Sequence, residues 1–326
     1  MLKIEPNIFI TIKNKLLEQG FLKNNPHILV GFSGGPDSMF LALFLVWLKD
    51  QNLITLNAAH FDHGWRAESA SEATFCKNFC RTNGIPFFLG ESKDFIDSIK
   101  ANGSKEELGR LMRREFFIKI KNDIGANFVA LAHHSQDQEE TFFIRLLRGS
   151  SLSGLTCMKI ISECKNYLRP LLDVSKHQIL EYLKENNIQF LTDPTNSSDD
   201  FLRNRIRNHV IPALTKADSR FNQKFKDTLF ALQEEESLLK EITNYKFDEV
   251  FENEEGSVKR FKEIHPSLQK RLLIKLFCQH KAHFKPSRSF LDEAIKFITS
   301  PRGGSHCMSK SWKLVKSKDK FQIKSL

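Results

Sequence analysis

The chain has 326 residues, which is long enough for two domains with separate cores. Its longest uninterrupted apolar run, residues 39–48, is far shorter than the ~20 residues that span a bilayer. The first ten residues contain Lys3 and Glu5 instead of the apolar segment of an export signal. We therefore expect a cytoplasmic protein without a membrane partner.

Six cysteines and no Cys-x-x-Cys pair fit a reducing compartment, and they argue against a zinc ribbon or an iron–sulfur cluster. Cys76 and Cys80 lie four residues apart in a helical apolar pattern, which favours core packing over metal binding.

The net charge is +10, and residues 257–326 contain 17 Lys and Arg against four acidic residues. This basic module predicts a polyanionic partner, most simply nucleic acid. The alternative is that the positive charge serves solubility alone.

The stretch HILVGFSGGPDSMF, residues 27–40, predicts an anion site between a strand and a helix. Residues 28–30 form an apolar run typical of a buried parallel strand. Gly34 and Gly35 make the turn, and Pro36 stands where a first helical residue needs no N–H. Backbone N–H groups and the helix dipole then face a common point that phosphate can approach closely.

The side chains of this loop fit the same chemistry. Ser33 and Ser38 supply hydroxyl donors, and Asp37 supplies a carboxylate for a hard cation such as Mg²⁺. The loop has neither the lysine nor the spacing of a Walker A motif. A Gly-Gly turn after a strand is common, so the prediction depends on the complete hexamer, residues 33–38.

Strands that alternate with helices over the first 150 residues predict an α/β fold with a doubly wound parallel sheet. We expect a first domain at 1–215, and a linking helix with a smaller, basic, mainly helical module at 216–326. The predicted strands are 28–30, 53–60, 85–89, 127–132, 167–172, and two short ones near 311–315 and 321–323. The predicted helices are 7–22, 36–48, 69–82, 104–124, 135–147, 175–186, 200–217, 220–245, 266–280 and 287–299.

Polar clusters follow the first, second and fourth predicted strands, where a parallel sheet binds its ligands. In the second, His60-Phe-Asp-His-Gly-Trp-Arg66, a metal site at His60, Asp62 and His63 and ordinary loop polarity are both open. Its place beside the first loop favours contact with a nucleotide base or ribose.

The third cluster, AHHSQDQEET at residues 132–141, predicts an amine site. If Ser135 caps the helix, Asp137 and Glu140 share a face and can hold an ammonium group and take its proton. The alternative is that acids in a first turn only complement the helix dipole. The neighbouring His133 and His134 favour the functional interpretation.

Arginines occur near this cluster and in a later basic helix. Arg113, on the helix before the fourth strand, could neutralise a triphosphate, although a solvated position is the default. Arg203, Arg205 and Arg207 alternate, so at most two of them can contact one ligand. They fit either phosphate contact or an interface paired with Asp199 and Asp200.

Six blocks in register, covering roughly residues 20–215, resemble the tRNA(Ile)-lysidine synthases, a family of N-type ATP pyrophosphatases with a PP-loop. The blocks are SGGPDS, HFDHGWR, AHHSQDQEET, RLLRGSSLSGL, YLRPLL and DPTNSSDDFLRNRIRN. The resemblance implies an adenine-nucleotide alpha hydrolase-like fold. It also implies a ligase that joins free L-lysine to the wobble cytidine, position 34, of the CAU anticodon of tRNA(Ile), through an adenylated tRNA with release of pyrophosphate and AMP.

By this resemblance residues 33–38 would hold ATP, with Asp37 on Mg²⁺. Arg113 would be catalytic and His133 would contact ATP, and Asp137 and Glu140 would bind and activate lysine. Arg205 would meet lysine or tRNA, and tRNA would be contacted by two further arginines, Arg203 and Arg207. The family often has a larger C-terminal part than the region after Arg220 in this chain.

Two other functions and the oligomeric state stay open. A PP-loop enzyme that thiolates tRNA cytidine would need the Cys-x-x-Cys pairs that this chain lacks. A non-catalytic RNA-binding protein that senses ATP would not need an amine-binding carboxylate pair such as Asp137 and Glu140. The sequence does not decide between a monomer and a homodimer.

Overall fold

The computed structural model describes residues 6–64, 69–95, 105–162, 166–192, 199, 201–280, 282 and 287–326. The chain divides into two compact units, Met1–Lys226 and Asp227–Leu326. The boundary falls within the long helix α10 (Phe221–Val250), in the region that the sequence predicts as a linking helix. Ser104, Arg66 and Asp200, which belong to predicted elements or motifs, lie outside the described residues.

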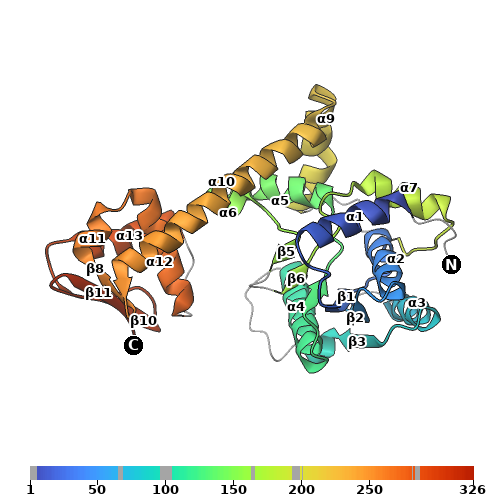
Figure 1. Ribbon diagram of the computed structural model, residues 1–326, viewed down its shortest axis with the longest axis horizontal. Helices are drawn as coiled ribbons and strands as arrows, with labels where there is room; N and C mark the ends of the chain where they lie inside the picture. The colour runs from blue at the N-terminus through green and yellow to red at the C-terminus, as the bar shows by residue number, and fades with distance from the viewer. Residues whose placement is uncertain are drawn as a thin grey trace. The chain divides into compact units, whose positions relative to one another are not determined.

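A six-stranded sheet forms the centre of the N-terminal unit (Figure 1). Its order is β3-β2-β1-β4-β6-β5, with all neighbours parallel except the edge strand β5. The strands are β1 (His27–Gly31), β2 (Thr55–Asp62), β3 (Phe87–Glu91), β4 (Phe128–Ala130), β5 (Ile161–Ser162) and β6 (Tyr167–Leu168). The predicted α/β fold with a doubly wound parallel sheet is confirmed.

Helices cover both faces of this sheet and create two cores. One core lies under α4, where Phe116 and Phe117 pack on Leu29 and Val129. The other lies under α1, α2 and α7, where the fully buried Phe9 contacts Phe40 and Tyr182. The helices are α1 (Asn7–Glu18), α2 (Pro36–Asp50), α3 (Ser69–Thr82), α4 (Lys105–Asp123), α5 (Ser135–Leu147), α6 (Leu152–Leu155) and α7 (Lys176–Glu185), with a 3₁₀ turn at Ser92–Asp94.

The predicted start of α2 is confirmed. Gly35 is the extended residue before the helix and Pro36 is its first residue. Gly34 has φ +75°, a conformation that costs other residues steric strain. The backbone therefore turns from β1 into α2 within a few residues, because glycine occupies the one left-handed position.

The predicted basic helix at 200–217 is three consecutive segments. They are α8 (Leu202–Arg205), a π-helical turn (Ile206–Val210) and α9 (Ile211–Ala217). Pro212 explains the change, because it has no N–H for the carbonyl four residues earlier and its ring crowds that carbonyl. The helix widens there, as π turns do where the regular ladder is interrupted.

The first turns of α10 pack on α5 within the N-terminal unit. The Phe225 ring lies edge-on to Phe142 with centroids 5.2 Å apart, and Phe221 stacks near Phe143 at 6.4 Å. Lys226 forms an ion pair with Asp173 at 3.4 Å. The first turns of α10, up to Lys226, are thus fixed to the rest of the N-terminal unit.

The C-terminal unit contains the expected helices and also a five-stranded antiparallel sheet, in the order β7-β8-β11-β10-β9. Its core includes Phe261, Leu276, Phe277, Trp312 and Leu314. The helices are α11 (Val258–Glu263), α12 (Pro266–Gln279) and α13 (Arg288–Thr299); the strands are β7 (Phe251–Glu252), β8 (Glu255–Ser257), β9 (Gly304–Cys307), β10 (Trp312–Ser317) and β11 (Lys320–Ser325). Only β10 and β11 were predicted.

None of the helices in the described ranges is long and apolar enough to cross a membrane.

We predict that Gly34→Ala destabilises the protein more than Gly125→Ala, by roughly 1 kcal/mol. Both glycines have positive φ, but a Cβ on Gly34 would lie 2.6 Å from Leu191 Cδ1, whereas Gly125 has nothing within 4 Å. The difference in unfolding free energy from urea titrations measures the crowding alone. Equal losses would show that Leu191 moves aside without cost.

Candidate active site

The first and third predicted clusters meet where the strand order reverses. β1 and β4 are parallel neighbours, with Leu29 beside Val129. From this pair the chain leaves β1 into α2 and β4 into α5, so two helix N-termini face one crevice at the carboxyl ends of the strands. This is the position at which open α/β sheets bind ligands.

Residues 33–38 form a loop that its own serines hold together. The Ser38 hydroxyl donates to the Gly35 carbonyl at 3.0 Å and accepts from the Ser33 N–H at 3.3 Å. Among the described residues, no acceptor is bonded to the N–H groups of Gly34 and Gly35. The loop thus has the donors and the missing Cβ atoms that a phosphate site needs.

A lysine from a distant helix reaches this loop. Lys176, the first residue of α7, donates from Nζ to Asp37 Oδ1 at 2.5 Å. Its backbone N–H donates to Gln136 Oε1 at 2.9 Å, which ties α7 to α5. Lys176 is not among the predicted site residues. A cation in the first turn of a helix is disfavoured by the helix dipole. This unusual position was the feature of the sequence that could have indicated a role for Lys176.

Asp37 fits the proposed contact with Mg²⁺. Its side chain is 29% exposed and already holds the Lys176 ammonium, while His134 Nε2 lies 3.7 Å from Oδ2. No group of three His, Cys, Asp or Glu forms a metal cage in the described parts of the chain. Mg²⁺ is commonly bound by one or two carboxylates together with substrate phosphates, so a single carboxylate suits a cation that arrives with ATP.

The structure corrects the predicted cap of α5: the capping residue is His134, and Ser135 is the first helical residue. Asp137 accepts the His134 N–H at 2.9 Å, because a carboxylate at the third position reaches back to the backbone before the helix. One oxygen of Asp137 therefore has the structural role that was the alternative prediction, at the start of the helix. The other oxygen faces Arg203.

Glu140 is the most buried acid of the site and is paired with two arginines. Its side chain is fully buried, and its oxygens accept from Arg203 Nε and Arg207 Nε, each at 2.5 Å. Arg203 Nη2 also donates to Asp137 Oδ1 at 2.8 Å. A buried carboxylate needs such partners, since an unpaired one is strongly disfavoured. The predicted common face of Asp137 and Glu140 is thus observed.

The three alternating arginines divide between two environments. Arg203 and Arg207 lie four residues apart and share Glu140, whereas Arg205 Nη1 donates to the Asp199 carbonyl at 3.0 Å. Two of the three arginines thus contact the same residue, Glu140, as the helical spacing predicted. The assignment of Arg205 to lysine or tRNA stays a prediction.

Charges around the crevice shift two pKa values. Burial alone would raise the pKa of Asp137, but His134, His133, Arg203 and the His134 N–H lower it below its usual range. Burial, together with the charges of Arg169, Arg203 and Arg113, lowers the pKa of His133 to about 4 against the opposing effect of Asp137. At neutral pH the site therefore contains an ionised Asp137 and a neutral His133.

The second predicted cluster supports the loop. His60 is buried, and its Nδ1 lies 2.9 Å from the Phe32 carbonyl, just before Ser33. Asp62 Oδ1 accepts the Gly64 N–H at 2.7 Å, which closes a turn. The contacts of His60 and Asp62 thus give both residues a role in local structure.

Cys76 and Cys80 are core residues, and burial raises the pKa of each thiol to about 12.

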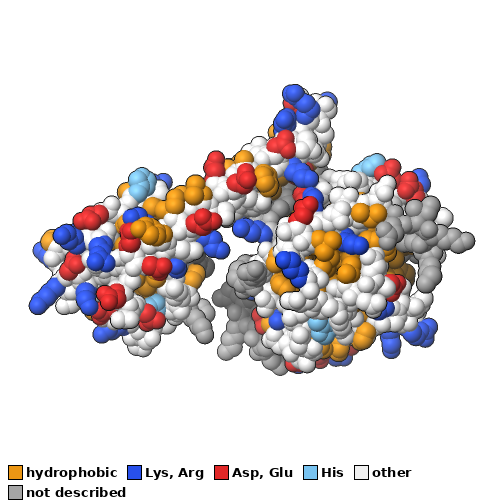
Figure 2. All heavy atoms as spheres, viewed as in Figure 1, with side chains coloured by type: hydrophobic (Ala, Val, Ile, Leu, Met, Phe, Trp, Pro, Cys, Tyr) orange, Lys and Arg blue, Asp and Glu red, His pale blue; other side chains and the backbone are white. Residues whose placement is uncertain are grey.

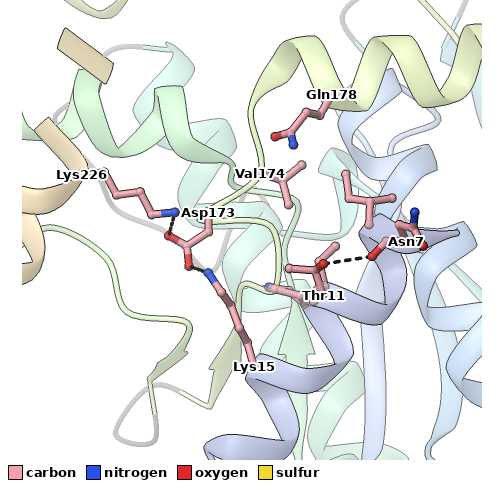
Figure 3. A pocket seen from close by; sticks show the side chains of 10 residues that line it. Asn7, Thr11, Lys15, Asp173, Val174, Gln178 and Lys226 are labelled. Atoms are coloured by element: carbon pink, nitrogen blue, oxygen red, sulfur yellow. Dashed lines mark hydrogen bonds and ion pairs between the residues drawn. The ribbon is translucent and has the colours of Figure 1, made fainter. Parts of the chain in front are cut away.

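A separate pocket of about 390 Å³ lies between α1 and the loop before α7 (Figure 3). Asp173 there is bonded to Lys15 and to Lys226. Burial would raise the pKa of Asp173, but the two ammonium groups lower it. None of the predicted site residues lines this pocket, and its one carboxylate fastens α1 and α10 to the loop.

The sheet, its switch point and the Gly-rich loop define a nucleotide-binding α/β domain. Residues 6–214 match the PP-loop domain family, and the chain belongs to it. The chain is similar to a tRNA(Ile)-lysidine synthase from Bacillus cereus, with 30% identity over 86% of this chain and 62% of the relative. A lysidine synthase from Borrelia garinii is 33% identical, over 90% of this chain and 66% of its own length. The chain thus spans about two thirds or less of these relatives.

Among solved structures, the fold is similar to a U34-tRNA thiolase from Methanococcus maripaludis that has a [4Fe-4S] cluster. The TM-score is 0.57 at 20% identity, over 70% of this chain and 80% of that one. At this identity the likeness concerns the fold alone.

We predict that Arg207→Ala lowers the unfolding free energy by about 2 kcal/mol, because it removes charged hydrogen bonds to a fully buried carboxylate. Arg205→Ala, two residues away and bonded to a carbonyl, serves as the matched control and should leave stability nearly unchanged. Urea titration of both variants measures the difference. Similar losses would mean that Arg207 does not stabilise Glu140.

We also predict a stability slope in acid that His133→Gln removes. The folded-state pKa of about 4 lies below the ordinary value of 6.5, so only the unfolded chain takes up a proton between these pH values. Stability therefore falls as pH drops from 6.5 to 4, and this contribution is absent above 6.5. Unfolding free energies at several pH values test it, with His177→Gln as the exposed control. Identical slopes in both variants would contradict a neutral, buried His133.

Proposed function

We propose that the chain is a lysidine-forming ligase, which uses ATP to join L-lysine to cytidine 34 of tRNA(Ile) with a CAU anticodon. The similarity to enzymes of that name supports the tRNA substrate, and membership of the PP-loop family supports ATP. The observation that carries the proposal is Asp137, a partly exposed carboxylate with a lowered pKa that His134 links to Asp37 of the phosphate loop. Glu140, on the same helix face, supports it through their common partner Arg203.

In the first step, cytidine O2 attacks the α-phosphate of ATP and pyrophosphate leaves. The N–H groups of Gly34 and Gly35 and the hydroxyl of Ser33 would bind the leaving pyrophosphate. Asp37 would hold Mg²⁺, which supplies positive charge to the phosphates. The Lys176 ammonium, released from Asp37, would then be free to neutralise the same oxygens. Stabilising charge that develops on a leaving group is commonly a large contribution to the rate.

In the second step, the ε-amine of lysine attacks C2 of the adenylated cytidine and AMP leaves. Asp137 is ionised at neutral pH and its side chain is 13% exposed, so it is the acid that meets the substrate ammonium. Glu140 is fully buried and positions Arg203 and Arg207 around it. Because its pKa is lowered, Asp137 stays ionised. It is therefore better suited to binding the lysine ammonium than to holding a proton taken from it.

The C-terminal unit would bind the tRNA through its basic elements. Exposed lysines and arginines occur on α11, α13 and the strands. Figure 2 shows Lys and Arg side chains, with acidic ones among them, on the visible face of this unit. Residues 227–256 differ sharply, with ten acidic residues against two lysines. The positive charge is thus concentrated on residues 257–326, where phosphate contact gives salt-dependent affinity. We likewise assign Arg203, Arg205 and Arg207 to the RNA side of the crevice.

We predict that Asp37→Ala abolishes pyrophosphate release and incorporation of labelled lysine into CAU-anticodon tRNA(Ile), and leaves tRNA affinity largely intact. Asp50→Ala, at the exposed other end of α2, is the matched control and should stay active. A transcript with an altered anticodon should accept no lysine. Pyrophosphate release without lysine transfer by the wild type would keep the PP-loop chemistry and overturn the lysine assignment. Binding of ATP and tRNA without any release would favour a sensor.

A further inference from the structure

The His134 ring lies between the carboxylates of Asp37 and Asp137 and is bonded to neither. Its side chain is 8% exposed, and Nε2 lies 3.7 Å from Oδ2 of each acid. The residue comes directly before α5, and the steps of the proposed reaction do not use its side chain. A movement of about 1 Å toward either side would bring the ring within hydrogen-bond distance of one acid.

The surroundings of the ring decide which nitrogen carries the proton. Nδ1 is buried, and in the described parts of the chain no acceptor is bonded to it. A buried N–H without an acceptor is costly, whereas both carboxylates lie on the Nε2 side. A neutral His134 therefore has its proton on Nε2. One donor thus faces two equidistant acceptors, and it can make a short, straight bond to only one of them at a time.

Other partners hold the far oxygen of each acid. Asp37 Oδ1 accepts from Lys176 Nζ at 2.5 Å, and Asp137 Oδ1 accepts from Arg203 Nη2 at 2.8 Å. Asp137 Oδ2 also accepts the backbone N–H of His134 at 2.9 Å. Because a carboxylate oxygen has two lone pairs, this oxygen can accept one further partner. The ring of His134 and the ammonium of a substrate would compete for that place.

We propose that His134 is a positioning residue that sets the order of the two steps. Its Nε2–H bonds Asp137 Oδ2 while magnesium pyrophosphate occupies Asp37, and it moves to Asp37 when pyrophosphate leaves. Departure of pyrophosphate thereby frees Asp137 for the lysine ammonium. This inference rests on the proposed function, to which it adds a coupling between the phosphate site and the amine site.

Calorimetric titration of lysine, with and without magnesium pyrophosphate, measures this coupling. The protein is bound to CAU-anticodon tRNA(Ile), and ATP is left out so that no step takes place. We expect magnesium pyrophosphate to weaken lysine binding about tenfold, the scale of one hydrogen bond to a charged group. Magnesium pyrophosphate has a net negative charge, so simple electrostatics would strengthen the binding of an ammonium instead. The sign of the effect therefore separates the coupling from the charge of the ligand.

Variants of His134 test whether the ring carries the coupling. His134→Phe keeps a ring and removes the donor, so the weakening should disappear. His134→Gln places an amide N–H near the position of Nε2 and should retain it. If His134→Phe retains the weakening, or if the wild type shows none, the proposal is wrong. If His134→Phe does not fold, His134→Met, which also has no donor, takes its place.

His27→Phe is the matched control. His27 begins β1, and its Nε2 lies 2.6 Å from Asn57 Oδ1, so the substitution removes a histidine contact without touching the crevice. Magnesium pyrophosphate should weaken lysine binding to this variant as much as to the wild type. Loss of the weakening here too would mean that general destabilisation causes it, and the proposal would be wrong.

The ring protons of His134 give a test that needs no lysine. In NMR spectra of protein with isotope-labelled histidine, the His134 signals are those missing from the His134 variant. Magnesium pyrophosphate should move the Nε2–H signal downfield, and less so in Asp137→Asn, because an amide is a weaker acceptor than a carboxylate. An unmoved signal would overturn the coupling. A wild type that binds no lysine but shows this shift would overturn the proposed function and leave the movement of His134 standing.

Discussion

The buried carboxylate of Glu140 is the constraint on which the crevice depends. A fully buried acid is tolerated only with strong partners, and here Arg203 and Arg207 supply them. These arginines come from a segment more than 60 residues later in the chain, as the 63-residue separation of Arg203 and Glu140 shows. The interaction therefore fixes the end of the PP-loop domain against α5.

The same cluster gives the site two electrostatic halves. The carboxylates of α5 lie on one side of the crevice, and the Lys176 ammonium lies beside the phosphate loop on the other. Asp37 and Asp137 are linked through His134, which lies 3.7 Å from each carboxylate. On the proposed function, a cation bound to Asp37 and an ammonium bound to Asp137 would act on neighbouring groups. A two-step reaction that first releases pyrophosphate and then admits an amine suits such a division.

Local sequence predicted the elements that are governed by local physics. The turn into α2 follows from Gly34, Gly35 and Pro36, and the predicted bounds of α3 and α5 agree with the structure. Asp137 and Glu140 could be placed on one face because a helix repeats every 3.6 residues. The cap of α5 was missed, because a backbone bond to Asp137 fixes His134 and no side-chain preference indicates it.

Contacts between distant segments could not be predicted in this way. Lys176 and Asp37 are 139 residues apart, and no periodicity relates them. The short strands β7, β8 and β9 have two to four residues each, too few for an alternating pattern.

The most direct test of the central claim is a pulse-chase on the two half-reactions. Enzyme with ATP and CAU-anticodon tRNA(Ile) would form the adenylated tRNA, and labelled lysine would then be added. The account predicts that Asp137→Asn releases pyrophosphate at close to the wild-type rate but transfers lysine at least about a hundredfold more slowly, the scale of a lost charged contact in a transition state. Equal loss of both steps, or normal lysine transfer, would contradict the assignment of the α5 carboxylates to the amine.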